Sequence, residues 1–345
     1  MAAGSTRRAP LLKDVAVAAG VHISTASRAL DERTAPQVNA DTVARVRQAA
    51  DELGYRVNGM ARALRRRQSL IVGMVVPDIT SPVFPAVVRG AEDVLSTVGF
   101  SLLLSNTDSD PAKARAQITA MLEGRADGLL LGIARRQDPV IDAFRAAGTP
   151  IVLVNRLIDR GGVPAVVADD FHGILMAVEH LSQLGHRQIG YVGGPSSLST
   201  AAQRLAGFEQ AARHFPLDPG GVAETAGFSE DAGLQAGREL LDGHPGTTAV
   251  VAANDLLAIG VIDAAAERGL SCPRDLSVVG FNDIGYVRRL QPPLTTIRIP
   301  HYEVGRRAAE LLLALVADPA RPPETVMLAG ELIVRGSTGR PRRRH

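Results

Sequence analysis

Short apolar runs alternate with amphipathic stretches along most of the chain, beginning near Leu70. The first run, residues 70–77, has no polar alternation, which is typical of a strand buried on both faces of a parallel sheet. Helical periodicity predicts helices at 83–98, 111–123, 139–147, 171–184, 200–215, 230–242 and 255–268, with a short strand near 224–226. Two consecutive series of this kind predict an α/β fold with two doubly wound parallel-sheet lobes.

The N-terminal stretch has a purely helical pattern. Apolar Val15, Ala18 and Ala19 recur at helical spacing, and Gly20 can adopt the left-handed conformation that ends a helix. A second helix is expected at about 23–30 and a third at 39–53. Three short helices with a glycine in the first turn predict a helix-turn-helix, whose second helix lies in the DNA major groove. An ordinary three-helix bundle is the alternative.

Charge separates this N-terminal part from the rest. Residues 1–70 hold 12 Lys and Arg against 6 Asp and Glu, whereas residues 71–334 hold 21 against 30. A basic N-terminal part on an acidic body indicates a polyanionic partner for that part alone, although a solvated basic surface would give the same count.

Cysteine content and hydropathy exclude several classes of protein. Cys272 is the only cysteine, so an intrachain disulfide and an all-cysteine metal site are excluded. No apolar stretch approaches the roughly 18 residues that a membrane span needs. The segment 6–13 has the look of a twin-arginine export signal, but the apolar run behind it, 15–21, is at the lower limit of length. An exported solute-binding protein therefore stays as the alternative.

The second helix of the N-terminal unit presents candidate base contacts. Ile23, Ser24 and Arg28 can face outward there, and a guanidinium matches the two acceptors of guanine. Ser24 can bond to phosphate or base, and Ile23 can contact a thymine methyl group. Thr25 completes the predicted set on this helix.

A series of motifs in order resembles the LacI/GalR type of transcriptional repressor. The chain carries KDVAVAAGVHISTASRAL, ELGYRVNGMARALR, IVGMVVPDITSPVF, PIVLVNR, LGHRQIGYVGG, RLAGF, AANDLLAIG, LSVVGFNDI and PPLTTI. Two caps depart from the family pattern, since Leu11 and His22 stand where Thr and Ser or Thr are usual.

The resemblance implies a domain plan. The expected parts are a DNA-binding domain at 1–57, a hinge helix or linker at 58–69, a two-lobed unit at 70–334 like type I periplasmic binding proteins, and a basic tail at 335–345. The first lobe is expected at about 70–169 and 300–327, and the second at about 170–299 and 328–334. In the linker, Asn58 and Arg62 are implied DNA contacts, and Leu64 is implied to wedge between base steps; packing of Leu64 on the dimer surface is the alternative.

Polar residues at the predicted strand ends form the candidate ligand site, because ligands of doubly wound sheets bind beyond the carboxyl ends of strands. The resemblance and these positions together give ten expected contacts: Phe84, Asn106, Asn155, Arg156, Asp169, Thr200, Arg204, Phe228, Asn254 and Asn282. Asp255 is expected to cap a helix instead. Two positions depart from the family, with Val83 replacing an aromatic residue and Asn282 replacing Asp.

The predicted function is a cytoplasmic, homodimeric, ligand-responsive repressor that binds a palindromic DNA operator. The effector is expected to be a sugar or sugar derivative, with a purine or nucleoside as second choice. No cofactor, metal or membrane is predicted. Catalysis is not expected either, because the chain has neither a GxSxG elbow nor a GxxxxGK loop. A sugar-processing enzyme on the same fold is the remaining rival.

Overall fold

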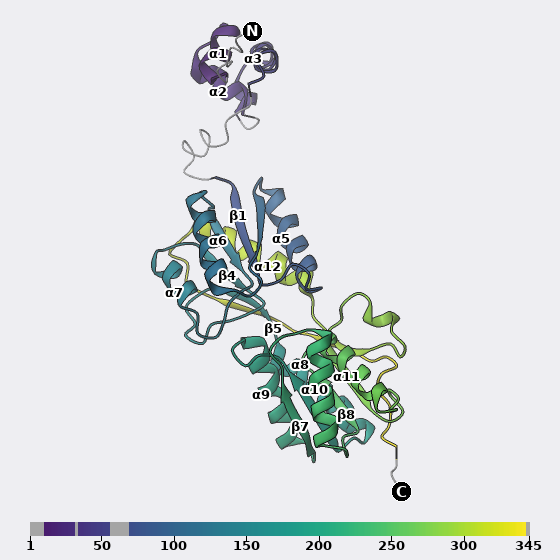
Figure 1. Ribbon diagram of the computed structural model, residues 1–345. Helices are drawn as coiled ribbons and strands as arrows, with labels where there is room; N and C mark the ends of the chain where they lie inside the picture. The colour runs from purple at the N-terminus through teal and green to yellow at the C-terminus, as the bar shows by residue number, and fades with distance from the viewer. Residues whose placement is uncertain (1–9, 32–33, 56–68, 343–345) are drawn as a thin grey trace, which may run out of the picture. The chain divides into compact units, whose positions relative to one another are not determined.

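The computed structural model describes residues 10–31, 34–55 and 69–342. The chain divides into two compact units, Met1–Ser69 and Leu70–His345. Each unit has its own buried core, and each is described here by itself. Figure 1 gives the order of the elements along the chain.

The N-terminal unit is a small helical domain. It contains α1 (Leu12–Ala18), α2 (Ile23–Ala29), the short 3-10 helix η1 (Ala35–Gln37) and α3 (Ala40–Leu53). Gly20 adopts a φ of 66° between α1 and α2, the left-handed conformation predicted for that turn. The core includes Val15, Ala26 and Val46, one from each helix. The helix-turn-helix prediction is confirmed, but Ala18 is exposed and Ala16 takes the buried position instead.

The second unit holds two six-stranded sheets. The first runs in the order β11-β5-β4-β3-β1-β2 and is parallel throughout. Its strands are β1 (Ile71–Val76), β2 (Ser101–Asn106), β3 (Gly128–Leu131), β4 (Ile151–Val154), β5 (Ala165–Ala168) and β11 (Thr325–Leu328). With α5 (Phe84–Thr97), α6 (Pro111–Glu123), α7 (Pro139–Ala146) and α12 (His301–Ala317), this sheet forms lobe 1.

Lobe 2 contains the second sheet, in the order β12-β10-β9-β8-β6-β7. Its strands are β6 (Gln188–Gly193), β7 (Asp218–Glu224), β8 (Ala249–Ala252), β9 (Ser277–Asn282), β10 (Thr295–Arg298) and β12 (Glu331–Ile333), the last antiparallel to β10. The helices are α8 (Asp170–Leu184), α9 (Ser199–His214), α10 (Glu230–Gly243) and α11 (Asp255–Glu267), with the 3-10 helix η2 (Val287–Arg289). The predicted α/β class with two parallel-dominated sheets is confirmed.

Alternating residues of each central strand pack against helices on opposite faces of the first sheet. Val72 and Met74 of β1 belong to the core formed with α5 and α12, whereas Val75 belongs to the core formed with α6 and α7. Apolar residues are therefore needed at every position, which explains the uninterrupted apolar runs in the sequence.

Strand β7 differs from its prediction, because it begins at Asp218 rather than near Glu224. Its first half contains Gly220 and Gly221, which disfavour regular strands, and the pairing with β6 shifts register between Ile189 and Tyr191. Such an irregular strand is tolerated here because β7 lies at the edge of the sheet.

The chain passes between the two lobes three times, after β5, after β10 and after β11. Two of these crossings are tied to lobe 2 by ion pairs. Asp283, which follows β9, accepts from Arg298 Nε at 2.8 Å and from Arg335 Nη2 at 2.6 Å. Arg298 also lies 3.6 Å from the Glu331 carboxylate, measured between Nη1 and Oε2. The ends of β10 and β12 are therefore held together on the lobe 2 side.

Helices α5 and α12 pack with their backbones in close contact. A Cβ atom built on Gly305 would lie 1.9 Å from the carbonyl oxygen of Val87, and one on Gly90 would lie 2.0 Å from that of Tyr302. Neither backbone can retreat without disturbing the core that both helices form with the first sheet. Glycine is therefore required at these two positions.

Gly305→Ala should destabilise the chain by about 1–3 kcal/mol, the usual cost of overpacking a close helix contact. Urea unfolding of the full chain measures it. Gly243→Ala, at the end of α10 where an added Cβ meets no atom within 4 Å, is the matched control and should leave stability unchanged or slightly raised. Equal midpoints for the two variants would contradict the packing argument.

Candidate functional site

The outer face of α2 carries the predicted base contacts. Ile23, Ser24 and Arg28 are exposed, while Ala26 and Ala29 on the opposite side are buried in the domain core. Thr25 is half-buried between these two faces. The helix thus presents a short apolar and cationic surface, as a recognition helix requires.

Both unusual caps of this unit work by other means. The His22 ring accepts a hydrogen bond from the Ser24 backbone N–H, 3.3 Å from Nδ1, and so replaces the usual hydroxyl. Leu11 has no side-chain oxygen, but the Asp14 carboxylate accepts from the Leu11 backbone N–H at 2.8 Å. The departures at these positions therefore leave the module intact. Asn58, Arg62 and Leu64 lie outside the described residues.

The second candidate site lies where the strand ends of the two lobes meet. The Leu157 backbone N–H donates to Ser199 Oγ at 2.8 Å, joining the turn after β4 to the start of α9. The Arg136 backbone N–H donates to the Ser197 carbonyl at 3.0 Å, joining the loop after β3 to the loop after β6. Each of the ten predicted ligand contacts lies at a strand end, beyond one, or in a helix of these two lobes.

Arg204 is the most enclosed charge among these contacts. It is 4% exposed, and its Nε donates to Asp170 Oδ1 at 2.8 Å, within an ion pair between α9 and the start of α8. Nη1 donates to the Ala253 carbonyl at 2.5 Å, and the guanidinium lies 3.9 Å from the centroid of the Phe281 ring. Three segments at strand ends thus hold the Arg204 side chain in place. Its remaining N–H donors therefore have a fixed orientation.

Arg156 lies near Arg204 but has no carboxylate partner among the described residues. Its Nε atom is buried and makes no hydrogen bond within that part of the chain. Burial, followed by repulsion from Arg135 and Arg204, lowers the pKa of Arg156 to about 10. The group remains protonated at neutral pH, so a half-buried positive charge lies here without an ion-pair partner among the described residues.

Several other predicted contacts already have local hydrogen-bonding roles. Asn254 caps α11 by accepting from the Leu257 N–H at 2.8 Å, and Asp169 caps α8 by accepting from the His172 N–H at 3.1 Å. Asn106 accepts from the Ile79 N–H at 2.9 Å. The expectation that Asp255 caps a helix is wrong, because its neighbour Asn254 does so. Asp255 is fully buried and accepts from the Ile284 N–H at 2.8 Å.

The two aromatic candidates pack against glycines at strand ends. Phe84 is 4% exposed, and the space beside Gly132, just after β3, is filled by its ring. Phe228 lies in the same way against Gly194, just after β6. Thr200 is buried in the first turn of α9, and Asn282, which ends β9, has a left-handed φ of 111°. The roles of these residues in ligand binding stay predictions.

His301 is a member of this region that sequence reasoning missed. It begins α12 directly after the second crossing, and both of its ring nitrogens are buried without a hydrogen-bond partner in the described residues. Burial, assisted by the Arg204 charge, lowers the pKa of His301 to about 4. No motif or periodicity in the sequence marks this position.

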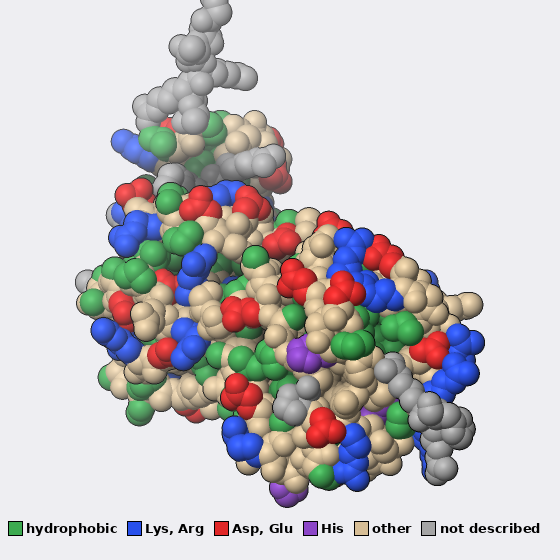
Figure 2. Space-filling view, turned by 60° about the horizontal axis from the view of Figure 1, so that its bottom comes forward, with side chains coloured by type: hydrophobic (Ala, Val, Ile, Leu, Met, Phe, Trp, Pro, Cys, Tyr) green, Lys and Arg blue, Asp and Glu red, His purple; other side chains and the backbone are tan. Residues whose placement is uncertain are grey.

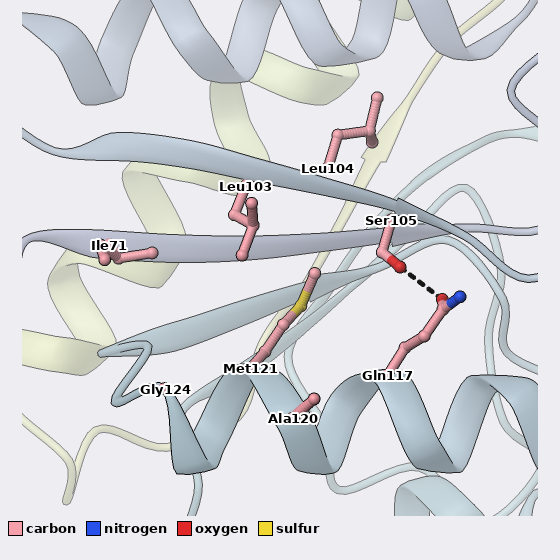
Figure 3. Close-up of a pocket in the computed structure, with 8 residues that line it drawn as sticks. All are labelled: Ile71, Leu103, Leu104, Ser105, Gln117, Ala120, Met121 and Gly124. Carbon is pink, nitrogen blue, oxygen red and sulfur yellow. Dashed lines mark hydrogen bonds between the residues drawn. The ribbon is translucent and has the colours of Figure 1, made fainter. Parts of the chain in front are cut away.

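A separate groove of about 300 Å³ lies on lobe 1 between β2 and α6 (Figure 3). The residues that line it are Ile71, Leu103, Leu104, Ser105, Gln117, Ala120, Met121 and Gly124, none of which is a predicted ligand contact. The exposed β2 edge therefore forms a surface feature distinct from the inter-lobe site.

The fold and these two sites define a class of protein: a DNA-binding domain joined to a two-lobed binding unit. Two family models match the chain. Residues 11–58 match the bacterial regulatory proteins of the lacI family, and residues 178–338 match the periplasmic binding protein-like domain.

Whole-chain relatives agree with this. The chain is 34% identical to the ribose operon repressor of Bacillus subtilis, covering 88% of this chain and 91% of the relative. It is also 34% identical to the transcriptional repressor CytR of Escherichia coli, covering 98% and 99%. The chain belongs to the lacI family of bacterial regulatory proteins.

Solved structures give the same result. A lac repressor dimer bound to operator and an anti-inducer matches with a TM-score of 0.86 and 28% identity, covering 96% of this chain and 100% of that one. A LacI-family regulator from Enterococcus faecium with bound ribose matches with a TM-score of 0.68 and 32% identity, covering 79% and 100%.

These findings decide between the predicted classes. The prediction that the chain is not an enzyme is confirmed, because the family consists of transcriptional regulators. The exported solute-binding alternative is not favoured, since the regulatory match includes the apolar run that an export signal would need. Among the described residues, no helix is long and apolar enough to cross a membrane.

The unpartnered His301 ring should make stability depend on pH. Its pKa is about 4 in the folded chain against an ordinary value of 6.5. Above the ordinary value the ring is neutral in both states; as the pH falls toward 4, only the unfolded chain gains the proton, and stability is lost. His301→Gln should therefore lose less stability between neutral pH and about pH 5, by on the order of 1–2 kcal/mol.

Urea unfolding at the two pH values measures this difference. The exposed His214 offers a matched control, since His214→Gln should lose as much stability as the unmodified chain. If His301→Gln behaves like that control, the His301 ring is not the group that titrates.

Proposed function

We propose that the chain is a ligand-responsive transcriptional repressor that binds a palindromic operator as a homodimer. The observation that carries the proposal is the joining of two parts in one chain. The first is a helix-turn-helix with Ile23, Ser24 and Arg28 exposed on its second helix; the second is a two-lobed unit with buried polar groups at its facing strand ends. Ligand binding to the second part can therefore regulate DNA binding by the first. Because such a protein must reach DNA, we propose that it is cytoplasmic.

The DNA contacts follow from the exposed face of α2. Arg28 is proposed to read guanine, with Ile23, Ser24 and Thr25 contacting neighbouring bases or phosphates. The linker is proposed to add Asn58 and Arg62, and Leu64 is proposed to insert between base steps and bend the operator. Two-fold symmetry of the protein would be mirrored in the two half-sites of the DNA.

A homodimer is supported by the lac repressor dimer, which matches the chain over nearly its whole length. The unpaired β2 edge of lobe 1 offers a surface for it, since Leu103 is 51% exposed beside the groove between β2 and α6. Exposed apolar edge strands are avoided in monomers because they pair with other chains.

The effector is proposed to be a sugar or sugar derivative bound between the lobes. Relatives support this class, including the regulator solved with ribose and the CelR regulator solved with cellobiose, which matches with a TM-score of 0.73 and 30% identity. A ligand held by both lobes would fix the angle between them, and so the spacing of the two DNA-reading units in a dimer. Ligand and operator are then coupled reciprocally, by roughly 1–3 kcal/mol.

The direct test is operator binding by the full chain. DNA fragments selected from a random pool, or captured from the genome, should share a palindrome, and one metabolite should change their affinity. If the full chain binds no duplex in preference to random competitor DNA, with or without metabolites, the proposal is contradicted.

Arg28→Ala should lower the preference for the selected operator over random duplex by about 1–3 kcal/mol, because the lost guanidinium contributes base contacts. Weak, salt-sensitive binding to any duplex should remain. Gel-shift competition at two salt concentrations measures both the preference for the operator and the salt-sensitive binding to any duplex. Arg45→Ala removes an equal charge from the exposed face of α3 and should keep the preference. Loss of preference in both variants, or in neither, would remove Arg28 as the reader.

A further inference from the structure

A histidine ring is enclosed where the chain passes from lobe 2 into lobe 1. Arg298 ends β10 and is held in lobe 2 by its ion pair with Asp283. Ile299 and Pro300 follow, and His301 then begins α12 in lobe 1. His301 is only partly exposed, and both of its ring nitrogens are buried without a hydrogen-bond partner among the described residues. The ring therefore lies at the crossing with no polar group of the described chain to bond.

The charge on this ring decides whether its enclosed position is tolerated. A neutral imidazole leaves two nitrogens unbonded, whereas an imidazolium would bury a full charge without a partner, which costs far more. Arg204 of lobe 2 adds a second positive charge that acts on the ring. Burial, followed by repulsion from Arg204, lowers the pKa of His301 to about 4, so the enclosed ring is neutral at neutral pH.

No carboxylate forms an ion pair with His301 in the described part of the chain. Acidic residues of α12 and of neighbouring elements have other partners: Glu303 pairs with Arg306, Asp93 with Arg89, Asp169 with His172 and Asp170 with Arg204. On the face shown in Figure 2, by contrast, acidic and basic side chains are interspersed over the surface. A histidine on such a surface can take up a proton beside water and carboxylates, but the enclosed His301 ring cannot.

The two lobes could rotate apart without unfolding, because each has its own hydrophobic core. The hydrogen bonds that join them at the junction include those from the Leu157 N–H to Ser199 and from the Arg136 N–H to the Ser197 carbonyl. Breaking these bonds would carry Arg204, in lobe 2, away from the histidine ring at the start of α12 in lobe 1. The ring would then meet water, where a proton costs little free energy near neutral pH.

We propose that His301 makes the arrangement of the lobes sensitive to pH: a neutral ring is compatible with the closed junction, and a protonated ring favours an open one. Acid thus acts on the same movement as the effector, in the opposite sense to a ligand that holds the lobes together. The opening needs neither ligand nor DNA, so it goes beyond the proposed repressor and can be measured on the full chain alone.

The distance between the lobes is measured in the full chain by electron–electron resonance between two spin labels. Ala116→Cys on α6 and Glu239→Cys on α10 give one exposed attachment site in each lobe, and Cys272→Ser removes the natural thiol. Dilution of labelled chains with an excess of unlabelled chains keeps the measured distance within one chain. Between about pH 7.5 and about pH 5.5, the ratio of open to closed chains should rise by about ten-fold, because an exposed ring is mostly charged at the lower pH and the enclosed ring is not.

Variants separate His301 from the other groups that titrate in this range. His301→Phe fills similar space and His301→Gln stays polar, but neither takes up a proton, so both should show the same distances at the two pH values. His214→Gln removes an exposed histidine and should keep the full response. Opening that persists in both His301 variants would assign the response to another group, such as His172, and overturn the proposal.

A permanent charge at the same position gives an independent test at one pH. His301→Arg should populate the open arrangement already at neutral pH, because its guanidinium cannot become neutral there. Unchanged distances in His301→Arg, or in the unmodified chain between the two pH values, would overturn the proposal. These results do not depend on DNA: a chain that opens with acid through His301 but prefers no operator would contradict the repressor proposal alone.

Discussion

The arrangement of both sites follows from one constraint, the parallel order of strands within each lobe. Parallel strands bring their carboxyl ends to one edge of a sheet, and the loops there can carry polar residues without disturbing the apolar core. Three crossings of the chain connect the two lobes. The strand ends of the two sheets lie together, since the Leu157 backbone of lobe 1 is hydrogen-bonded to Ser199 of lobe 2. Ligand contacts can therefore come from segments far apart in the sequence, such as Arg156, Arg204 and Asn282.

Much of this organisation could be predicted from periodicity alone. The helices at 111–123 and 230–243 lie within one residue of their predicted ends, because amphipathic stripes and capping residues such as Asp110 and Ser229 are local signals. The sequence predicts a strand only near 224–226, because Gly220 and Gly221 disfavour a regular strand. The position of β7 is set instead by its pairing with β6. Ala18 fits the helical spacing of apolar residues but is exposed, since spacing alone cannot fix how a short helix is rotated on its neighbours.

The candidate site was predictable only in part. Strand-end positions and family motifs gave Arg156 and Arg204, but the partner that neutralises Arg204, Asp170, depends on how α8 and α9 pack. That Arg156 has no carboxylate partner among the described residues depends on tertiary packing, which no local pattern encodes. His301 was missed for the same reason: an ordinary histidine at a helix start becomes unusual only when Arg204 and the lobe junction enclose it.

The ion pairs around Asp283 limit where two of the three crossings between the lobes can bend. Arg298 and Arg335 both bond this carboxylate, and Arg298 also lies near Glu331, so the strands entering and leaving two of the crossings belong mechanically to lobe 2. In these two of the three crossings, a rotation between the lobes would be absorbed by the residues beyond the ion pairs, at 299–301 and 329–330. His301 stands in one of these pivots and Gly330 in the other. Charge pairing in lobe 2 thus limits which residues of two crossings can bend, and one of these segments ends at the start of α12.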